Sequence, residues 1–219
     1  MLKLDRRAAV EGVGTALLLA AVIGSGIMAE RLAGGNAAVA LLANSLATGG
    51  ALLALISAFG PLSGAHFNPL VTIALALRGS FPRREVPAYA AAQGLGAFAG
   101  VVIANLMFGI AAIDFSTRVR GGAGQLLGEV VATFGLLSIV MACGKRQAAG
   151  AVAGYITAAY WFTSSTSFAN PAVTLARCLS DTFAGIRPAD APLFIAAQSV
   201  GALLSFAFIR WLNPAPEAA

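Results

Sequence analysis

The sequence predicts an all-α polytopic membrane protein with six transmembrane helices and two half-helices arranged as an inverted repeat. Three observations predict this fold class: a very apolar composition, six long apolar segments, and two short Asn-Pro segments that recur in the same order. The chain has 219 residues, of which 58% are hydrophobic and 11% charged, and its mean hydropathy is +0.83. Soluble domains carry about 25% charged residues, so this chain is expected to cross a membrane several times.

The six long apolar segments are the predicted transmembrane helices. They cover residues 8–30, 36–59, 86–109, 124–144, 148–166 and 191–212, and a bilayer span needs about 20 apolar residues. The first segment follows basic residues, as the core of a signal peptide does. Because it is longer than such a core and further segments follow, we expect an uncleaved first helix.

Two shorter segments, 68–78 and 170–180, each begin with Asn-Pro and hold only about ten apolar residues. Proline suits the first turn of a helix because its missing N–H has no partner there, and asparagine is a good N-cap. Each segment is therefore predicted to be a half-helix that enters the membrane without crossing it and presents its positive dipole end at its N-terminus. Two ordinary proline-initiated turns are the alternative.

An internal duplication disfavours that alternative. Glu11 matches Glu129, residues 91–97 match 196–202, and the two Asn-Pro pairs match each other, in the same order and at offsets of 118, 105 and 102. One domain, 1–219, is thus predicted to contain a first repeat, 1–109, and a second, 124–219. Three spans per repeat is an odd number, so the repeats are expected to be inverted, with Asn68 and Asn170 meeting at the membrane midplane.

Charge predicts the orientation in the membrane. With both termini in the cytoplasm, nine of the fourteen basic residues face the cytoplasm and five face outward, which satisfies the positive-inside rule in a plasma (inner) membrane. The nine are Lys3, Arg6, Arg7, Arg78, Arg83, Arg84, Lys145, Arg146 and Arg210, and the five are Arg31, Arg118, Arg120, Arg177 and Arg187. A pI near 9.9 is also typical of proteins that bind nucleic acids. Here the basic residues form no stripe, so no nucleic-acid partner is expected.

The loops before the half-helices, 60–67 and 163–169, place non-helical backbone at membrane depth, where it persists only when it is buried in protein or lines water. Their carbonyl groups are predicted to form a ladder of acceptors for neutral, hydroxyl-rich solutes. The predicted ladder residues are Gly64, Ala65, His66, Thr166 and Phe168.

Polar residues inside the apolar segments support these loops in our interpretation. Glu11 and Glu129 occupy matching positions and can act as proton relays, but we favour acceptance of backbone N–H bonds from the loops. Gln93 and Gln198 carry the same two interpretations. His66, the single histidine, is a candidate pH sensor, although a loop-stabilising hydrogen bond is favoured.

Small residues recur on two helix faces, at Ala92, Gly96 and Gly100 and at Ala197, Gly201 and Ser205. Such faces predict close helix packing. The sequence contains no nucleotide-binding loop, metal-ligand cluster or nucleophile–base pair, so no enzyme activity, cofactor or metal is expected.

The order of these features, with Ser63 to Pro69 in the first half and Asn170-Pro171-Ala172 in the second, resembles the aquaporin (major intrinsic protein) family over nearly the whole chain. The resemblance implies six full and two half helices, a pore in each protomer and a homotetramer. It also implies a passive channel for water and small neutral solutes.

Two positions depart from the family pattern. Leu70 stands where the family usually has alanine, and Val173 stands where most members carry the arginine of an outer selectivity filter. The filter positions by family spacing are Thr48, Ala158, Ser167 and Val173. Arg177, one helical turn beyond Val173, is expected to face the outer vestibule or a neighbouring helix.

The filter set is small and uncharged, which implies a wide outer filter without a fixed positive charge. It resembles a bacterial subgroup associated with arsenic and other metalloids, and implies passage of glycerol-like polyols, metalloid hydroxides such as arsenite, and water. A water-selective aquaporin is the first alternative. A proton-coupled carrier that uses Glu11 and Glu129 as relays is the second.

Overall fold

The computed structural model describes residues 2–144 and 146–212, and every described element is a helix. This confirms the predicted all-helical class. The predicted cytoplasmic position of Lys145 and the end of the second repeat, 213–219, lie outside the described residues.

The first half of the chain forms four α-helices. They are α1 (Leu4–Leu32), α2 (Ala37–Ser63), the short α3 (Pro69–Leu77) and α4 (Val86–Met107), with a 3₁₀ turn, η1 (Arg83–Glu85), before α4. The α2 helix includes Pro61 and is capped after Ser63 by Gly64, whose positive φ of 100° suits the glycine that closes a helix. The chain then enters an extended loop that leads to α3.

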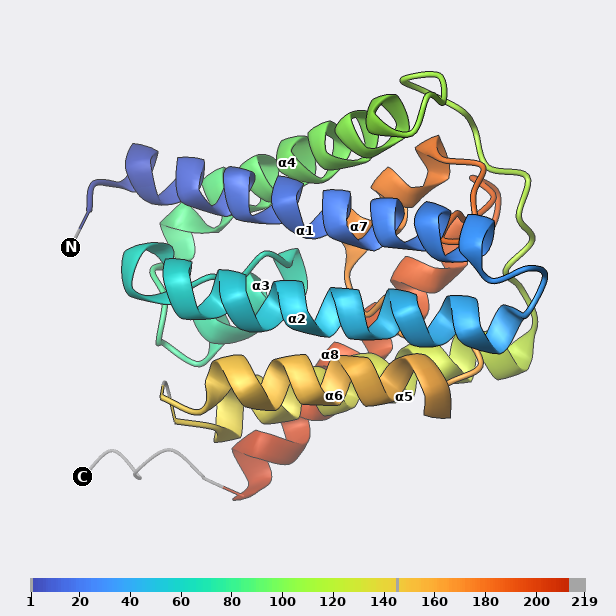
Figure 1. Cartoon of the computed structure of the whole chain (residues 1–219). Helices are drawn as coiled ribbons and strands as arrows, with labels where there is room; N and C mark the ends of the chain where they lie inside the picture. The colour runs from blue at the N-terminus through green and yellow to red at the C-terminus, as the bar shows by residue number, and fades with distance from the viewer. Residues whose placement is uncertain (1, 145, 213–219) are drawn as a thin grey trace, which may run out of the picture.

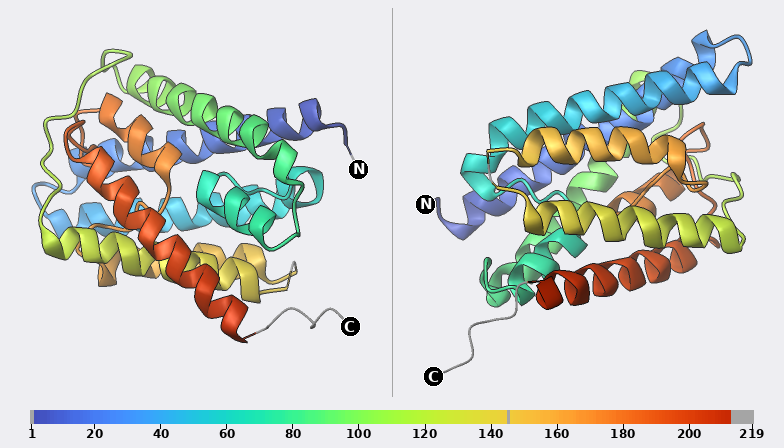
Figure 2. Two further views of the ribbon diagram at one scale, coloured as in Figure 1. Left: turned by 180° about the vertical axis from the view of Figure 1, so that it is seen from behind. Right: turned by 90° about the horizontal axis from the view of Figure 1, so that it is seen from below.

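The second half repeats the order long, long, short, long. It contains α5 (Ala123–Ala142), α6 (Ala148–Phe162), the short α7 (Pro171–Ala176), a 3₁₀ turn, η2 (Arg177–Leu179), and α8 (Ala191–Leu212). Figure 1 shows α3 and α7 inside the bundle, between the long helices and on opposite sides of its middle. We call the end where α1 begins and α8 ends the terminal end, and the opposite end the distal end (Figure 2).

Glycines allow the closest helix contacts. A Cβ at Gly96 of α4 would lie 2.1 Å from the Gly12 carbonyl oxygen of α1, and one at Gly201 of α8 would lie 2.4 Å from the Val130 carbonyl oxygen of α5. Only glycine permits backbones to approach this closely. The predicted small-residue faces are therefore confirmed as the α1–α4 and α5–α8 contacts.

The lateral surface of the bundle is apolar. Leu95 and Leu203, for example, expose 73% and 64% of their surface on α4 and α8. Five described helices are long and apolar enough to cross a bilayer: α1, α2, α4 with its preceding turn, α5 and α8. A surface of this kind is stable against lipid tails and costly in water.

Two predicted segments end earlier than expected. The α6 helix stops at Phe162 rather than at 166, because the chain turns at Thr163 into the second loop, where the Thr163 hydroxyl donates to the Ala159 carbonyl (2.7 Å). The predicted half-helix 170–180 is α-helical only to Ala176 and continues as η2.

Candidate functional site

The two Asn-Pro segments cap their short helices as predicted. Asn68 and Asn170 both have extended backbones. The Asn68 Oδ1 accepts from the Leu70 N–H at 2.9 Å, and the Asn170 Oδ1 accepts from the Ala172 N–H at 3.0 Å. The side-chain oxygen of each asparagine is therefore engaged by the backbone, and its amide group is the part that points elsewhere.

The same two amide groups join the halves of the chain. The Asn68 Nδ2 donates to the Ala169 carbonyl at 2.8 Å, and the Asn170 Nδ2 donates to the Phe67 carbonyl at 2.8 Å. An amide group has two hydrogens, so each asparagine keeps one donor beyond this reciprocal pair. Both residues line the central cavity, where the second hydrogen is available to a solute.

The loops that precede the asparagines have an unusual backbone. Five non-glycine residues have φ between 49° and 63°, namely Ala65, Phe67, Thr166, Ser167 and Ala169. Left-handed conformations in such residues cost about 1–3 kcal/mol each and persist only where their surroundings enforce them.

Glu11 supplies that enforcement in the first half. One carboxylate oxygen accepts from the Ser63 hydroxyl (2.6 Å) and the His66 N–H (3.0 Å). The other accepts from the Phe67 N–H (2.7 Å) and the Gln93 side-chain amide (2.9 Å). Four donors thus converge on one carboxylate that is completely buried.

Glu129 performs the same task in the second half with three donors. It accepts from the Phe168 N–H and the Ala169 N–H, both at 2.9 Å, and from the Gln198 amide at 2.6 Å. Gln198 also reaches the Thr174 hydroxyl at 2.8 Å, as Gln93 reaches Thr72 at 3.0 Å. These contacts correspond to the loop-supporting interpretation of all four predicted residues.

His66 is held by its neighbours. Its Nδ1 lies 3.1 Å from the Thr72 hydroxyl, and its ring packs against Phe81 and Tyr89, with centroids 5.1 and 5.3 Å apart. The predicted loop-stabilising contact is therefore present.

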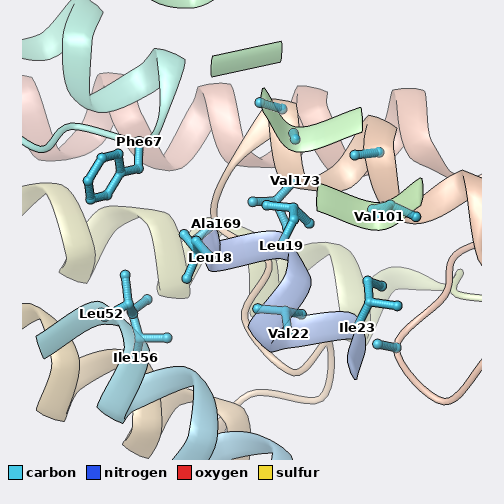
Figure 3. Packing of buried hydrophobic residues seen from close by; sticks show 14 of the residues in the cluster. Leu18, Leu19, Val22, Ile23, Leu52, Phe67, Val101, Ile156, Ala169 and Val173 are labelled. Carbon is cyan, nitrogen blue, oxygen red and sulfur yellow. The ribbon is translucent and has the colours of Figure 1, made fainter. Parts of the chain in front are cut away.

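A cavity of about 130 Å³ runs past both asparagines. A cavity needs a volume of about 10–15 Å³ to hold one water molecule, so this cavity holds several waters or one small solute. Its wall is mainly apolar, and Figure 3 shows part of it, with Leu52 of α2 beside Ile156 of α6 and Leu18 of α1 nearby. Of the predicted ladder residues, Gly64, Ala65, His66 and Phe168 belong to the wall. Thr166 does not, and its hydroxyl oxygen lies 3.4 Å from Arg120 Nη1.

Three of the four predicted filter residues, Thr48, Ser167 and Val173, line this cavity. Ala158 does not line the cavity, so the prediction that it belongs to the filter is wrong. The α6 wall residues recur every fourth position, at Ala148, Val152, Ile156 and Tyr160. Ala158 is two residues, or about 200°, from both Ile156 and Tyr160, and it is exposed on the outside of the bundle.

Tyr160 takes the place in the wall that family spacing assigned to Ala158. It is 3% exposed, and its hydroxyl forms a hydrogen bond of 3.1 Å with the hydroxyl of Thr48, which also lines the cavity. Residues 148–162 are apolar at nearly every position, so the sequence carries no strong signal for this face.

Arg177 is the second residue that the sequence placed incorrectly. It lines the cavity rather than facing a vestibule or a neighbouring helix, and only 2% of its surface is exposed. Its guanidinium therefore adds a positive charge to the cavity wall, close to the predicted filter residues. Its side chain stacks on the Phe168 ring and donates from Nε to the Ala184 carbonyl, and these contacts hold it at the cavity wall.

A second buried arginine lies close to the first. Arg120, from the connection between α4 and α5, donates to the carbonyls of Gly185 (2.7 Å) and Phe183 (3.2 Å). Burial and the positive charges of Arg177 and Arg118 lower the pKa of Arg120 to about 9, which leaves it charged at neutral pH.

Comparisons with known proteins agree with this architecture. The family model described as major intrinsic protein matches residues 2–162. The aquaglyceroporin AqpS of Rhizobium meliloti (strain 1021) is 52% identical over 212 residues, which cover 95% of this chain and 91% of the relative. The aquaporin AqpM of Methanothermobacter marburgensis is 33% identical over an alignment of 251 residues, covering 97% of this chain and 99% of the relative.

The fold also matches a solved structure. The X-ray structure of the aquaglyceroporin from Plasmodium falciparum superposes with a TM-score of 0.75 at 20% identity, over 97% of this chain and 98% of that one. Together with the paired asparagines and the glutamate-supported loops, the family match over residues 2–162 settles the assignment. The chain belongs to the major intrinsic protein family.

Proposed function

We propose that this protein is a passive transmembrane channel for small uncharged solutes: water, glycerol-like polyols and metalloid hydroxides such as arsenite. The family and the apolar helices make the chain a multi-pass membrane protein. The observation that carries the proposal is the reciprocal pair of asparagine bonds, which leaves one amide hydrogen on each of two asparagines that line the cavity.

The chemistry of the wall favours neutral, hydroxyl-bearing solutes. The asparagine amides donate to a solute oxygen, the loop backbone offers carbonyl acceptors, and the rest of the wall is apolar and forms no competing bond. A polyol or an uncharged metalloid hydroxide exchanges its water contacts for these groups. The 52% identical relative carries the name aquaglyceroporin, which supports the polyol part of the proposal.

Metalloid hydroxides are the most specific class of solute in this proposal. Arsenite is an uncharged hydroxyl compound at neutral pH, so it presents the same donors and acceptors as a polyol. The support is this likeness of chemistry, together with the small side chains of Thr48, Ser167 and Val173 at the distal part of the cavity.

Flux measurements on the purified protein in proteoliposomes test the proposal. Stopped-flow light scattering with glycerol, urea and arsenite as osmolytes is expected to show faster uptake than empty liposomes for each solute. Permeability equal to that of empty liposomes for every solute and for water contradicts a channel function.

A water-selective channel is the second candidate, because Tyr160 and Arg177 add a polar aromatic ring and a cation to the distal wall. The same panel separates the two candidates. Water flux with glycerol, urea and arsenite all excluded favours the second.

The proposal extends to topology and assembly. We place the terminal end in the cytoplasm, because the basic residues gather there, and the protein in the plasma (inner) membrane as a homotetramer. Residues 1–109 and 124–219 are proposed to be inverted copies within one channel domain. Both glutamates are occupied by three or four donors each, which favours structural support over a proton-coupled carrier.

A further inference from the structure

We propose that Arg177 supplies the positive charge that governs the distal constriction of the channel, in place of the uncharged Val173. This inference rests on the proposed channel function and concerns which ions that channel rejects.

The position follows from the helix. Val173 and Arg177 are four residues apart, and both belong to the cavity wall together with Tyr160 and Ser167. Val71 and Leu75 occupy the equivalent positions in the first half, and they also belong to the wall. The cavity is thus bounded by an apolar side chain toward the terminal end and by a cation toward the distal end.

Two contacts fix the guanidinium. Its Nε donates to the Ala184 carbonyl, and its central carbon lies 3.4 Å from the ring centre of Phe168. The Phe168 ring is itself packed edge-on against Phe194, with centroids 5.3 Å apart. A stacked arginine beside a packed ring has little rotational freedom, and the Nε bond uses only one of its five N–H donors.

No carboxylate forms an ion pair with Arg177 within residues 2–144 and 146–212. The two ion pairs in that part of the chain join Arg7 to Glu85 and Arg187 to Asp190. Arg120 adds a second cation, with its guanidinium carbon 5.0 Å from the centre of the Phe168 ring. Burying an unpaired cation is costly, and such residues at membrane depth mark a solute path.

The Arg177 guanidinium therefore repels cations and donates hydrogen bonds to neutral solutes. A cation that enters the distal cavity has lost most of its water and meets a fixed positive charge at short range, where screening is weak. A polyol or hydroxide instead accepts a hydrogen bond from the guanidinium. Arg177 therefore separates charged from uncharged solutes, while Tyr160, Thr48 and Val173 determine the width.

The test compares three variants with the wild-type protein in proteoliposomes. Arg177→Gln removes the charge, Arg177→Lys keeps it without the planar stacking, and Arg118→Gln removes an exposed charge next to the same region. Glycerol uptake is measured by stopped-flow light scattering. Proton and sodium leak are measured with entrapped fluorescent indicators.

We expect Arg177→Gln to raise the cation leak at least tenfold while glycerol uptake stays equal or increases. Arg177→Lys should stay within about threefold of the wild-type leak, and Arg118→Gln should equal it. An unchanged leak in Arg177→Gln protein that retains the wild-type thermal midpoint overturns the inference. Equal leaks in the Gln and Lys variants also overturn it, because they assign the effect to packing.

A measurement on the wild-type protein covers the case in which Arg177→Gln does not fold. Its residual ion conductance, from reversal potentials in a NaCl gradient, is expected to favour chloride over sodium at least fivefold. Equal permeability to both ions contradicts the inference. Absence of glycerol and water flux in the same wild-type vesicles would instead contradict the proposed channel function.

Discussion

The two halves of the molecule share a framework and differ at the ends of the cavity. In both halves a glutamate, a glutamine and a threonine hold a left-handed loop that ends in Asn-Pro. Beyond that framework, the first half has His66 and Leu75 where the second half has Phe168 and Arg177. The comparison indicates that the loop framework is duplicated, whereas the cavity-lining side chains at the two ends differ.

The largest expected effect concerns the shared framework. Glu11→Leu leaves four donors without an acceptor, of which three are buried and one is partly buried, and Glu129→Leu leaves three buried donors. Since each unsatisfied buried donor costs about 1–3 kcal/mol, both variants are expected to lose the folded state, as measured by size-exclusion and thermal unfolding in detergent.

The conservative substitutions Glu11→Gln and Glu129→Gln compare the two halves more finely. Glu11→Gln is expected to lower the thermal midpoint more than Glu129→Gln, because more donors depend on Glu11. Equal midpoints for the two Gln variants contradict the difference between the halves. Saturable, pH-driven uptake that is lost in a folded Glu129→Gln protein would instead support the carrier alternative.

The next effect concerns the helix contacts that both halves share. Gly96→Ala places a Cβ 2.1 Å from the Gly12 carbonyl oxygen, so α1 and α4 must separate, at an expected cost of about 1–3 kcal/mol. Gly94→Ala on the same helix is the matched control, because nothing lies within 4 Å of its Cβ. That control is expected to be neutral or slightly stabilising, since alanine favours helix. Equal destabilisation of both variants contradicts the close approach.

The smallest expected effect concerns width at the distal end. Tyr160→Ala removes a ring from the cavity wall and is expected to raise glycerol permeability several-fold, with water flux changed less. Ala158→Val alters the outer face of the same helix and is expected to leave both fluxes unchanged. A larger change from Ala158→Val than from Tyr160→Ala would return the filter position to Ala158.

Much of this architecture could be predicted from the sequence because the duplication repeats local signals. Asn-Pro marks a capped helix start by itself, and a glutamate inside an apolar segment requires donors that only a neighbouring loop can provide. The role of Glu11, Glu129, Gln93 and Gln198 in supporting the loops could therefore be predicted from the sequence. Glycine at 96 and 201 implied close packing for a similarly local reason.

The distal wall could not be predicted from family spacing. Family spacing counts residues along the chain from the Asn-Pro motifs, and within α6 that count is off by two residues, at Ala158 instead of Tyr160. A shift of two residues reverses the face, so Ala158 and Tyr160 exchange places. Arg177 was misplaced because its orientation depends on Phe168 and Ala184, which reach it through folding rather than sequence proximity.

The reciprocal asparagine bonds also constrain biosynthesis. The acceptor of Asn68 is Ala169, which is translated 101 residues later. At about 5–20 residues per second the wait is on the order of 5–20 seconds, and during that time the first re-entrant loop has its Asn68 donor unsatisfied. We therefore expect the two loops to reach their final positions together, after Ala169 has been synthesised.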